Sequence, residues 1–251
     1  MVGIICNDDH DVFAAVARRL ERAGVSVRFF EPGRPLGEAD IADLSLLMNK
    51  KVAPASMDAL AHAERTGLRT WNGYWTVVLG LRLVGYSALE HVGFQVPPVS
   101  LEEPDGEYVA KTLADWHFRP DPERNGEGDI YQELVPATPV DYKYYAVDTG
   151  SDIRVRVLKT TSKLHGPKEP IALVEPEPRL ADRVRDLMRL TDSQALGVDC
   201  VRADGKYWAV DVNPAMSFRN AEMEAELAAS VLARLSPTGT GEVVGAESTR
   251  A

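Results

Sequence analysis

The chain has 251 residues, of which 45% are hydrophobic and 26% are charged, and its formal net charge is −10. This composition is ordinary for a globular protein with one large or two modest domains. The acidic balance argues against a nucleic-acid partner, because an acidic surface repels phosphate backbones.

The cysteines and the apolar runs indicate the compartment. Cys6 and Cys200 each lie in an apolar, strand-like run, which predicts two buried free thiols and argues against a disulfide or a zinc site. No apolar run approaches the roughly 20 residues that span a bilayer, and residues 1–6 are too short for a signal sequence. We therefore expect a cytoplasmic protein with no membrane partner.

Residues 1–71 alternate predicted strands and helices. Strands are expected at residues 2–6, 25–30 and 44–48, and helices at about residues 12–23 and 54–65. This alternation predicts parallel β-α-β units and a small doubly wound sheet. The first strand is followed by Asn7-Asp8-Asp9-His10 and not by a Gly-x-Gly-x-x-Gly segment, which argues against a dinucleotide-binding fold.

Residues 70–73 are predicted to form a turn that precedes one long amphipathic helix. Apolar side chains recur at helical spacing from Val77 to Val92, and Gly93 ends the pattern. Arg82 lies in this helix, where it is either a solvated surface residue or a ligand for phosphate.

The next two predicted strands carry polar residues in apolar surroundings. Lys111 lies inside the strand at residues 107–113, and a lysine there usually has an anionic partner. The strand at residues 130–136 contains the sequence Gln132-Glu133-Leu134-Val135. The polar segment between the strands, residues 114–128, has few glycines, and they come late.

A further pair of strands is expected at residues 140–147 and 153–158. The first contains Asp141 and Lys143, and the second places Arg154 and Arg156 on one face. This pair of arginines is either solvated or part of an anion-binding pocket. The segment that follows, residues 160–178, is polar and contains prolines, and a helix is expected near residues 180–188.

Residues 196–201 and 207–212 form a predicted β-hairpin with Asp204-Gly205 at its turn. Asp211 and Asn213 share one face of the second arm, and we expect the hairpin to bring Asp199 opposite them. Carboxylates inside apolar strands need a partner, and Mg²⁺ takes oxygen ligands completed by phosphates and water. The pattern predicts a magnesium site, and the alternative is a solvent-facing strand.

The residues Gly197-Val198-Asp199 and Asp211-Val212-Asn213-Pro214 resemble the metal-binding hairpin of the ATP-grasp superfamily. The Gln-Glu-x-Val sequence at residues 132–135 resembles the adenine-binding segment of that superfamily. Within that superfamily, these two segments are most similar to those of the RimK-type carboxylate–amine ligases. The resemblance implies an ATP-grasp fold of α/β and α+β class, with a pre-ATP-grasp α/β domain at residues 1–71, two lobes that clasp ATP at residues 72–235, and a disordered tail at residues 236–251.

The resemblance also implies roles for residues of this chain, with ATP and Mg²⁺ or Mn²⁺ as cofactors. The expected metal ligands are Asp199, Asp211 and Asn213. The expected nucleotide ligands are Arg82 and Lys111 at the phosphates, Gln132, Glu133, Leu134 and Val135 at the adenine, and Asp141 or Glu133 at the ribose. Lys143 is expected to face the transferring phosphate or the acyl substrate, Lys159 the γ-phosphate, and Ser217, Arg219 and Asn220 the substrate. This chain lacks the compact glycine-rich phosphate loop of the family. Either Trp116, His117 or Arg119 takes over the role of that loop, or the segment is mobile.

These roles imply an ATP-dependent carboxylate–amine ligase that forms an acyl phosphate on a small carboxylic acid, an amino acid or a peptide. Two alternatives stay open. One is a small-molecule kinase whose phosphorylated acceptor is held by Arg154, Arg156 and Arg219, and the other is a nucleotide-binding subunit without catalysis. The sequence is compatible with a homodimer.

Overall fold

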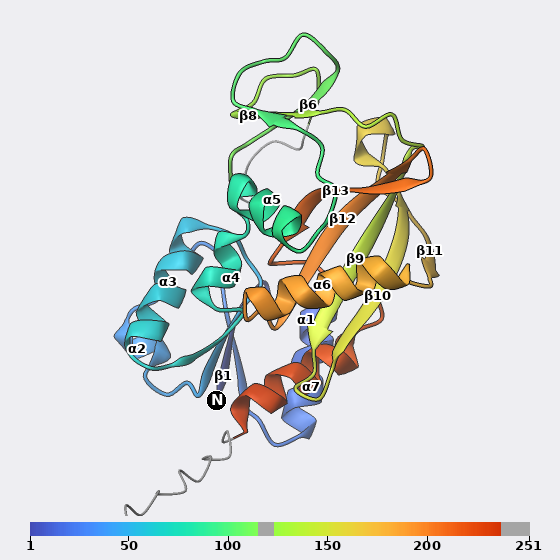
Figure 1. Cartoon of the computed structure of the whole chain (residues 1–251). Coiled ribbons are helices and arrows are strands. Elements are labelled where there is room, and N and C mark those ends of the chain that lie inside the picture. Colours follow the sequence, from blue (N-terminus) through green and yellow to red (C-terminus); the bar gives the residue numbers. More distant parts are fainter. Residues whose placement is uncertain (115–122, 237–251) are drawn as a thin grey trace, which may run out of the picture.

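The computed structural model describes residues 1–114 and 123–236 of the chain. Three sheets and the helices that cover them make up this part (Figure 1). The predicted substitutes for the glycine-rich loop, Trp116, His117 and Arg119, lie outside the described residues, as does the predicted tail apart from Ser236.

The N-terminal sheet is parallel and has the strand order β2-β1-β3-β4. Its strands are β1 (Val2–Ile5), β2 (Val27–Phe30), β3 (Leu46–Asn49) and β4 (Arg69–Trp71), and its helices are α1 (Asp11–Arg22), α2 (Glu38–Ile41) and α3 (Pro54–Arg65). The predicted parallel β-α-β units are therefore confirmed. The turn predicted at residues 70–73 is wrong for its first half, because Thr70 and Trp71 are buried and pair with β3.

The single long helix predicted from Val77 to Val92 is wrong, because the segment forms two helices, α4 (Tyr74–Val78) and α5 (Arg82–His91). Between them Gly80 lies against Val52, where an added Cβ would be 3.1 Å from a methyl group. The backbone N–H of Arg82 donates to the carbonyl of Leu113 at 2.9 Å. The break places Arg82 in the first turn of α5, beside the small sheet described next.

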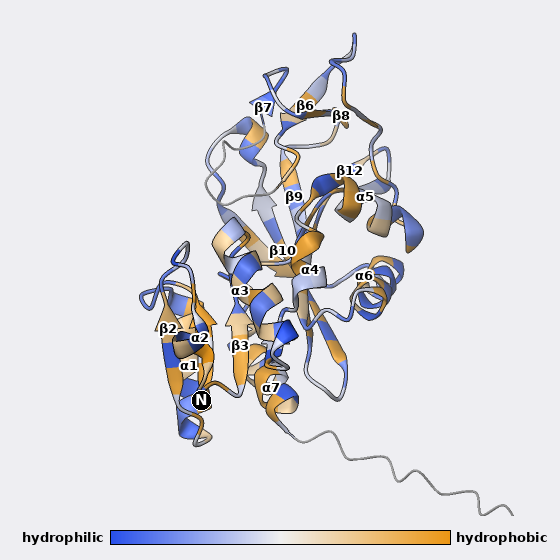
Figure 2. Ribbon diagram, turned by 90° about the vertical axis from the view of Figure 1, so that its left-hand side faces the viewer, coloured by the Kyte–Doolittle hydropathy of each residue, from blue (hydrophilic) through white to orange (hydrophobic). Residues whose placement is uncertain are grey.

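The small sheet has the order β5-β8-β6-β7 and is antiparallel. Its strands are β5 (Val99–Ser100), β6 (Tyr108–Lys111), β7 (Glu123–Arg124) and β8 (Ile130–Glu133). Figures 1 and 2 both place this sheet at the end of the molecule away from helix α7 (Glu224–Leu235).

The large sheet is antiparallel, with the order β11-β10-β9-β12-β13. Its strands are β9 (Val140–Asp148), β10 (Ile153–Thr161), β11 (Pro170–Val174), β12 (Ala195–Ala203) and β13 (Lys206–Asn213), with the short helix η1 (Lys163–His165) before β11 and helix α6 (Pro178–Leu190) after it. Strand β11 was not expected in the polar segment 160–178. Its side chains are mostly exposed because it is an edge strand, a position where a proline is tolerated.

The two faces of the large sheet pack against different partners. One face buries side chains such as Tyr144 and Val198 against α5 and α6. The other buries Tyr145 and Leu158 in a core that also contains α1, α7 and the hydrophobic side chains of β1 and β3. The N-terminal sheet and the large sheet therefore share one hydrophobic core, to which β3 contributes an almost wholly hydrophobic strand (Figure 2).

Burial tests the sequence expectation for the two cysteines. Cys6 and Cys200 are buried free thiols, as predicted. Among the described helices, none combines the length and hydropathy that a membrane crossing needs.

Asn72 joins the N-terminal part of the chain to both arms of the hairpin β12–β13. Its side chain is 1% exposed. The Oδ1 atom accepts hydrogen bonds from the backbone N–H groups of Gln194 and Ala195, both at 2.9 Å. The Nδ2 group donates to the carbonyls of Ala195 and of Pro214, the latter at 2.8 Å. One buried amide therefore satisfies four backbone groups that no water reaches.

We predict that Asn72→Ala lowers the free energy of unfolding by about 3 kcal/mol, because it leaves several buried backbone groups without partners. Urea unfolding followed by tryptophan fluorescence measures this loss. The exposed helix substitution Arg18→Ala is the control and should change stability by less than about 0.5 kcal/mol. Equal midpoints for the two variants would contradict the bridging role of Asn72.

Candidate functional site

A cavity of about 530 Å³ lies where the N-terminal sheet, the small sheet and the large sheet meet. Of the residues predicted for the site that the structure describes, all line this cavity except Lys159 and Asn220. The lining includes Arg82, Lys111, Gln132, Glu133, Leu134, Val135, Asp141, Lys143, Asp199, Asp211, Asn213 and Arg219. Residues that are more than 130 positions apart in the sequence are thus brought to one place.

Lys159 lies on the other face of the large sheet. It pairs with Tyr142, and its Nζ atom is 5.9 Å from the centre of that ring. The residues on either side of it, Leu158 and Thr160, pair with Lys143 and Asp141, which line the cavity. Because side chains alternate along a strand, the side chain of Lys159 points away from the cavity, which argues against its predicted contact with a γ-phosphate there.

A β-bulge sets the register of the hairpin. Both turn residues have positive φ, 49° at Asp204 and 76° at Gly205, as a two-residue turn of this kind requires. Regular pairing outward from this turn would place Val210 opposite Asp199. The pairing instead shifts by one residue after Cys200, so that Asp199 pairs with Asp211. The predicted juxtaposition of the two carboxylates is confirmed, and the bulge produces it.

The bulge is held by side chains from outside the hairpin. The carbonyl of Val210 accepts a hydrogen bond from Lys111 Nζ at 2.6 Å and from the Tyr86 hydroxyl at 3.3 Å. Lys111 Nζ also donates to Gln132 Oε1 at 2.7 Å and to the Tyr86 hydroxyl at 3.0 Å. Bulges occur next to active sites because they re-aim side chains, and here the extra residue turns Asp211 toward Asp199.

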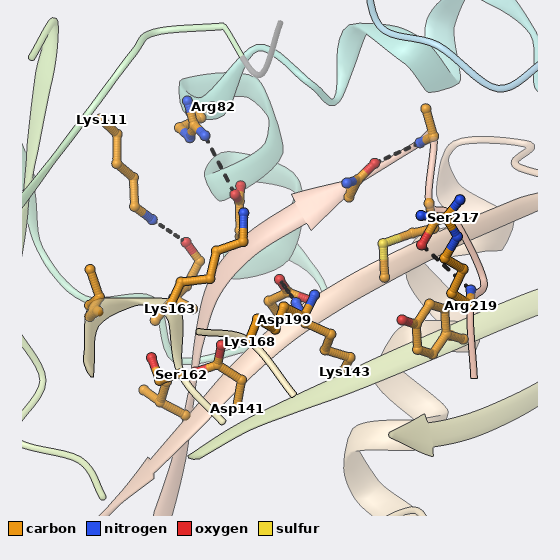
Figure 3. Close-up of a pocket in the computed structure, with 18 of the residues that line it drawn as sticks. Arg82, Lys111, Asp141, Lys143, Ser162, Lys163, Lys168, Asp199, Ser217 and Arg219 are labelled. Carbon is orange, nitrogen blue, oxygen red and sulfur yellow. Dashed lines mark hydrogen bonds and ion pairs between the residues drawn. The ribbon is translucent and has the colours of Figure 1, made fainter. Parts of the chain in front are cut away.

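Each carboxylate of the hairpin faces a cation (Figure 3). Lys143 on β9 lies directly across from Asp199 and forms an ion pair with its Oδ2 atom. Arg82 Nη2 is 3.6 Å from Asp211 Oδ2. The second oxygen of Asp199, Oδ1, is buried and has no hydrogen-bond partner among the described residues.

These charges shift one another's titration. Burial opposes ionisation of Asp199, but the ammonium groups of Lys143 and Lys168 lower the pKa of this carboxyl. Burial likewise opposes the charge on Lys143, yet the carboxylate of Asp199 raises the pKa of Lys143. Burial and the adjacent Lys143 lower the pKa of Lys168 to about 8. Burial and the nearby Asp199 raise the pKa of Asp141. The crowding of lysines around one carboxylate leaves a position where an added anion is stabilised.

The end of β8 offers polar groups next to apolar walls. The N–H groups of Glu133 and Leu134 donate to the carbonyls of Pro98 and Glu107, each at 2.9 Å. Within the described part of the chain, the N–H of Val135 has no acceptor. Gln132 is 2% exposed, and its Nε2 group also lacks a partner there. Of the predicted backbone donors at this edge, the one on Val135 is therefore available to a ligand.

Several lining residues were missed by the sequence reasoning. Lys50 and Lys51 follow β3, and His10 follows β1, at the carboxyl ends of parallel strands. Such ends commonly hold ligands, so their positions after predicted strands were a usable signal. Lys163 and Lys168 lie in the connection from β10 to β11. Nothing pointed to them, because the return of the chain along β11 was not predicted.

The lining is basic although the protein is acidic. Among the described residues it contains eight Lys and Arg side chains and five Asp and Glu side chains, in a chain whose net charge is −10. A concentration of positive charge in a concave site attracts anions. The cavity therefore suits a ligand with several negative charges.

The hairpin donors fit a magnesium ion that is shared with a ligand. The described residues contain no group of three or more His, Cys, Asp and Glu side chains placed to hold a metal. Asp199, Asp211 and Asn213 supply two carboxylates and one amide oxygen, and Asn213 Oδ1 is oriented by the N–H of Ala215 at 2.8 Å. Mg²⁺ commonly takes one or two carboxylates and completes its shell with phosphates and water. The unpartnered Oδ1 atom of Asp199 is in keeping with such a ligand role.

Comparisons with known proteins identify the fold. No protein-family model and no curated protein sequence matches the chain. Among solved structures, the ATP-grasp ligase PsnB complexed with a minimal precursor has a TM-score of 0.68 at 16% identity, over 93% of this chain and 99% of that one. A RimK domain ATP-grasp protein from Sphaerobacter thermophilus has a TM-score of 0.66 at 13% identity, over 93% and 98%. The D-alanine–D-alanine ligase from Bacillus anthracis has a TM-score of 0.64 at 10% identity, over 93% and 97%.

The chain has the ATP-grasp fold over most of its length, as the hairpin and the strand end at residues 132–135 predicted. At these identities the likeness establishes the fold, and the activity has to be argued from the site.

Gly85 lets helix α5 approach the hairpin. An added Cβ at this position would lie 2.4 Å from Val212 Cγ1 and 2.6 Å from the carbonyl oxygen of Leu79. The glycine thereby fixes the distance between the first turn of α5, which carries Arg82, and β13, which carries Asp211.

We predict that Gly85→Ala lowers the melting temperature. An alanine inside a helix normally stabilises it by about 1 kcal/mol relative to glycine, so a loss points to the close approach. Ser87→Ala, an exposed substitution on the same helix, is the control and should leave the melting temperature unchanged or slightly raised. A stabilised Gly85→Ala variant would show that α5 can move away from the hairpin without consequence.

We predict that Asp199→Asn lowers the free energy of unfolding at pH 7 by about 3 kcal/mol, because it leaves the buried Lys143 without its main counter-charge. Adding Lys143→Met should recover part of this loss. Because the pKa of Asp199 is lowered in the folded protein, its stabilisation is present above the ordinary carboxyl range and is lost as the pH falls through the lowered value. Urea unfolding of the wild type, both single variants and the double variant at pH 7 and in acid measures the coupling; additive effects would exclude the pair as a stabilising contact.

Proposed function

We propose that this protein is an ATP- and Mg²⁺-dependent carboxylate–amine ligase. The observation that carries the proposal is the convergence, in one cavity of an ATP-grasp fold, of a base-binding strand end, a set of buried cations and the oxygen donors of the hairpin. The structures similar to this chain include ATP-grasp ligases of several kinds.

The nucleotide would lie between the small sheet and the hairpin. The N–H of Val135 and the Nε2 group of Gln132 supply hydrogen-bond donors to the base, while Leu134 and Val210 contribute apolar contacts. Asp141 is placed in the same cavity for the ribose. Structures of PsnB contain ADP and Mg or AMPPNP, which supports the same ligand class here.

The phosphates would enter the basic part of the cavity. Lys111 and Arg82 reach it from the small sheet and from α5, and Lys143 reaches it from β9. Asp199, Asp211 and Asn213 would hold Mg²⁺ or Mn²⁺, which neutralises phosphate charge when it is bound. Occupation of Asp199 by the metal would release the ammonium of Lys143 toward a phosphate.

The chemistry requires positioning more than reactive side chains. A carboxylate oxygen of the substrate attacks the γ-phosphorus of ATP, the bond to the β-phosphate oxygen breaks, and ADP leaves. An amine then attacks the acyl carbon, the amide C–N bond forms, and inorganic phosphate departs with the amine proton passed to solvent. Lysine and arginine side chains lower the barrier by holding the charged groups together and by compensating the developing charge. No protein nucleophile takes part.

The acyl substrate would occupy the end of the cavity lined by Ser217 and Arg219. We propose a small carboxylic acid, an amino acid or a peptide as the substrate class. Support for a peptide comes from structures of PsnB and of the macrocyclase MdnC from Microcystis aeruginosa with their precursor peptides. The two buried free thiols support a reducing, cytoplasmic location.

The kinase alternative loses most of its motivation. Arg154 pairs with Asp152 at 2.9 Å, and Arg156 is 3.4 Å from Glu226 and 3.6 Å from Glu222. Neither arginine lines the cavity within the described part of the chain, so of the three arginines proposed for a phosphorylated acceptor only Arg219 does. A non-catalytic subunit is disfavoured because such a protein has no physical reason to retain two carboxylates and a buried lysine in apolar strands. Product mass separates ligase from kinase, since a ligase yields an amide and free phosphate.

We predict that Asp211→Ala lowers the rate of ADP release with carboxylate and amine pairs by about a hundredfold or more, because it removes a charged ligand from the metal site. A coupled ADP assay measures the rate, and Asp186→Asn, an exposed carboxylate on α6, is the control. The same variant should lose the stabilisation by Mg-ATP, which in the wild type reaches about 2.7 kcal/mol at a hundredfold excess over the dissociation constant. Undiminished ADP release would contradict the assignment of Asp211 to the metal.

A further inference from the structure

The cavity has a second basic end, built by connections of the N-terminal sheet. Lys50 and Lys51 line it from the connection between β3 and α3, and His10 lines it from the connection between β1 and α1. Arg219 reaches the same end from the segment between β13 and α7. None of these residues was assigned above to the nucleotide or to the metal.

The backbone around the lysine pair is held rigidly. The side chain of Asn49 accepts a hydrogen bond from the N–H of Lys51 at 3.0 Å and donates to its carbonyl at 2.6 Å. The Ser56 hydroxyl donates to the same carbonyl at 3.0 Å and accepts from the N–H of Ala53 at 3.1 Å. Both Asn49 and Ser56 are buried. Two lysines are thus presented to the cavity on a preorganised loop, and the side chain of Lys50 is 4% exposed.

Lys50 and Arg219 are close enough to act on one side chain, that of His10, and Lys50 and Lys51 both act on Cys6. Burial, the ammonium of Lys50 and the guanidinium of Arg219 together lower the pKa of His10. Two carboxylates are also present. Asp11 accepts a hydrogen bond from Arg219 Nε at 3.0 Å, and Asp9 lines the cavity with an exposed side chain. Among the described residues that line this end, the cations Lys50, Lys51 and Arg219 stand beside these two acids.

This end is separate from the part of the cavity assigned to ATP. Figure 3 shows Ser217 and Arg219 on one side of the Lys143–Asp199 pair, with Arg82 and Lys111 on the other. A carboxylate that reacts with the γ-phosphate must lie near the pair itself. Arg219 lies beyond the pair and therefore faces a different part of the substrate, and Lys50 acts on the same His10 as Arg219 does.

We propose that Lys50, Lys51 and Arg219 form an anion subsite for a second negatively charged group of the acyl substrate, a carboxylate or a phosphate, in addition to the carboxylate that reacts. This inference rests on the proposed ligase function for the placement of the reacting carboxylate. The substrates of this class would be acids with two anionic groups.

Binding of three matched acids tests the subsite. The protein is first saturated with Mg-AMPPNP, and its affinity is then measured by calorimetry for glutarate, for 3-phosphonopropionate and for valerate, which carries a single anionic group. We expect at least one of the two dianions to bind about tenfold more tightly than valerate, as an added charged hydrogen bond implies. Glutarate and 3-phosphonopropionate distinguish a carboxylate from a phosphate as the second group.

Variants then locate the effect. Lys51→Gln and Lys50→Met should each weaken binding of the preferred dianion by about tenfold and leave the affinity for valerate unchanged. Lys206→Gln, which removes the same charge from the exposed hairpin turn, should change neither affinity. The thermal shift by Mg-AMPPNP reports whether each variant folds. If Lys50→Met does not fold, the affinities of Lys51→Gln decide the test.

Two outcomes overturn the subsite: equal affinity of the wild type for the dianions and for valerate, including no binding of any of them, or an equal loss for all three acids in the lysine variants. ADP release separates this inference from the proposed function. If the wild type discriminates in favour of a dianion through Lys51 but releases no ADP with any acid and amine, the ligase proposal fails and the anion subsite stands. If ADP is released equally with valerate and glutarate and both bind equally, the ligase stands and the subsite fails.

Discussion

The bulge at Val210 is the constraint on which the geometry of the site depends. Without the register shift, regular pairing outward from the two-residue turn would place Val210 opposite Asp199 and turn Asp211 to the other face of the sheet. Lys111 and Tyr86 bind the carbonyl that the bulge exposes. Lys111, which is proposed to bind the phosphates, therefore also holds the hairpin that carries the proposed metal ligands, and a nucleotide that drew Lys111 away would change the contacts of the hairpin. In the proposed function, nucleotide and metal binding would be linked through this one ammonium group.

Charge compensation explains how such a site is stable without ligands. Isolated charges are costly in a partly buried cavity, but Asp199 has Lys143 and Asp211 has Arg82. Binding of a magnesium–phosphate ligand would exchange partners on both sides: the carboxylates pass from protein cations to the metal, and the cations pass from carboxylates to phosphates. The number of opposite-charge contacts is conserved in this exchange, which lowers its cost. Burial and the nearby ammonium of Lys143 lower the pKa of Lys168 to about 8.

Local patterns in the sequence predicted the fold class and most of the cavity lining. The alternation in residues 1–71, the hairpin turn at Asp204-Gly205 and the strand end at residues 132–135 are short-range signals, and each is found in the structure. The failures have long-range causes. Helix α5 begins at Arg82 because that residue bonds to Leu113, about thirty positions away, and β11 forms because β10 offers it an edge. Lys159 was assigned from its place in a motif, whereas the pairing with Tyr142 decides the face on which it lies.

The two ends of the cavity differ in how firmly they are attached to the rest of the protein. The end that carries Lys50 and Lys51 belongs to a sheet that shares a hydrophobic core with α7 and the large sheet, and Asn72 fastens that sheet to both hairpin arms. The small sheet, by contrast, contributes only Ile130 and the partly buried Val99 to the hydrophobic clusters of the described residues. Relative motion therefore costs least at the small sheet, which carries Lys111 and the edge proposed to bind the base. An acyl substrate would bind to the fixed part of the protein, while the nucleotide would be enclosed by the part whose contacts are fewest.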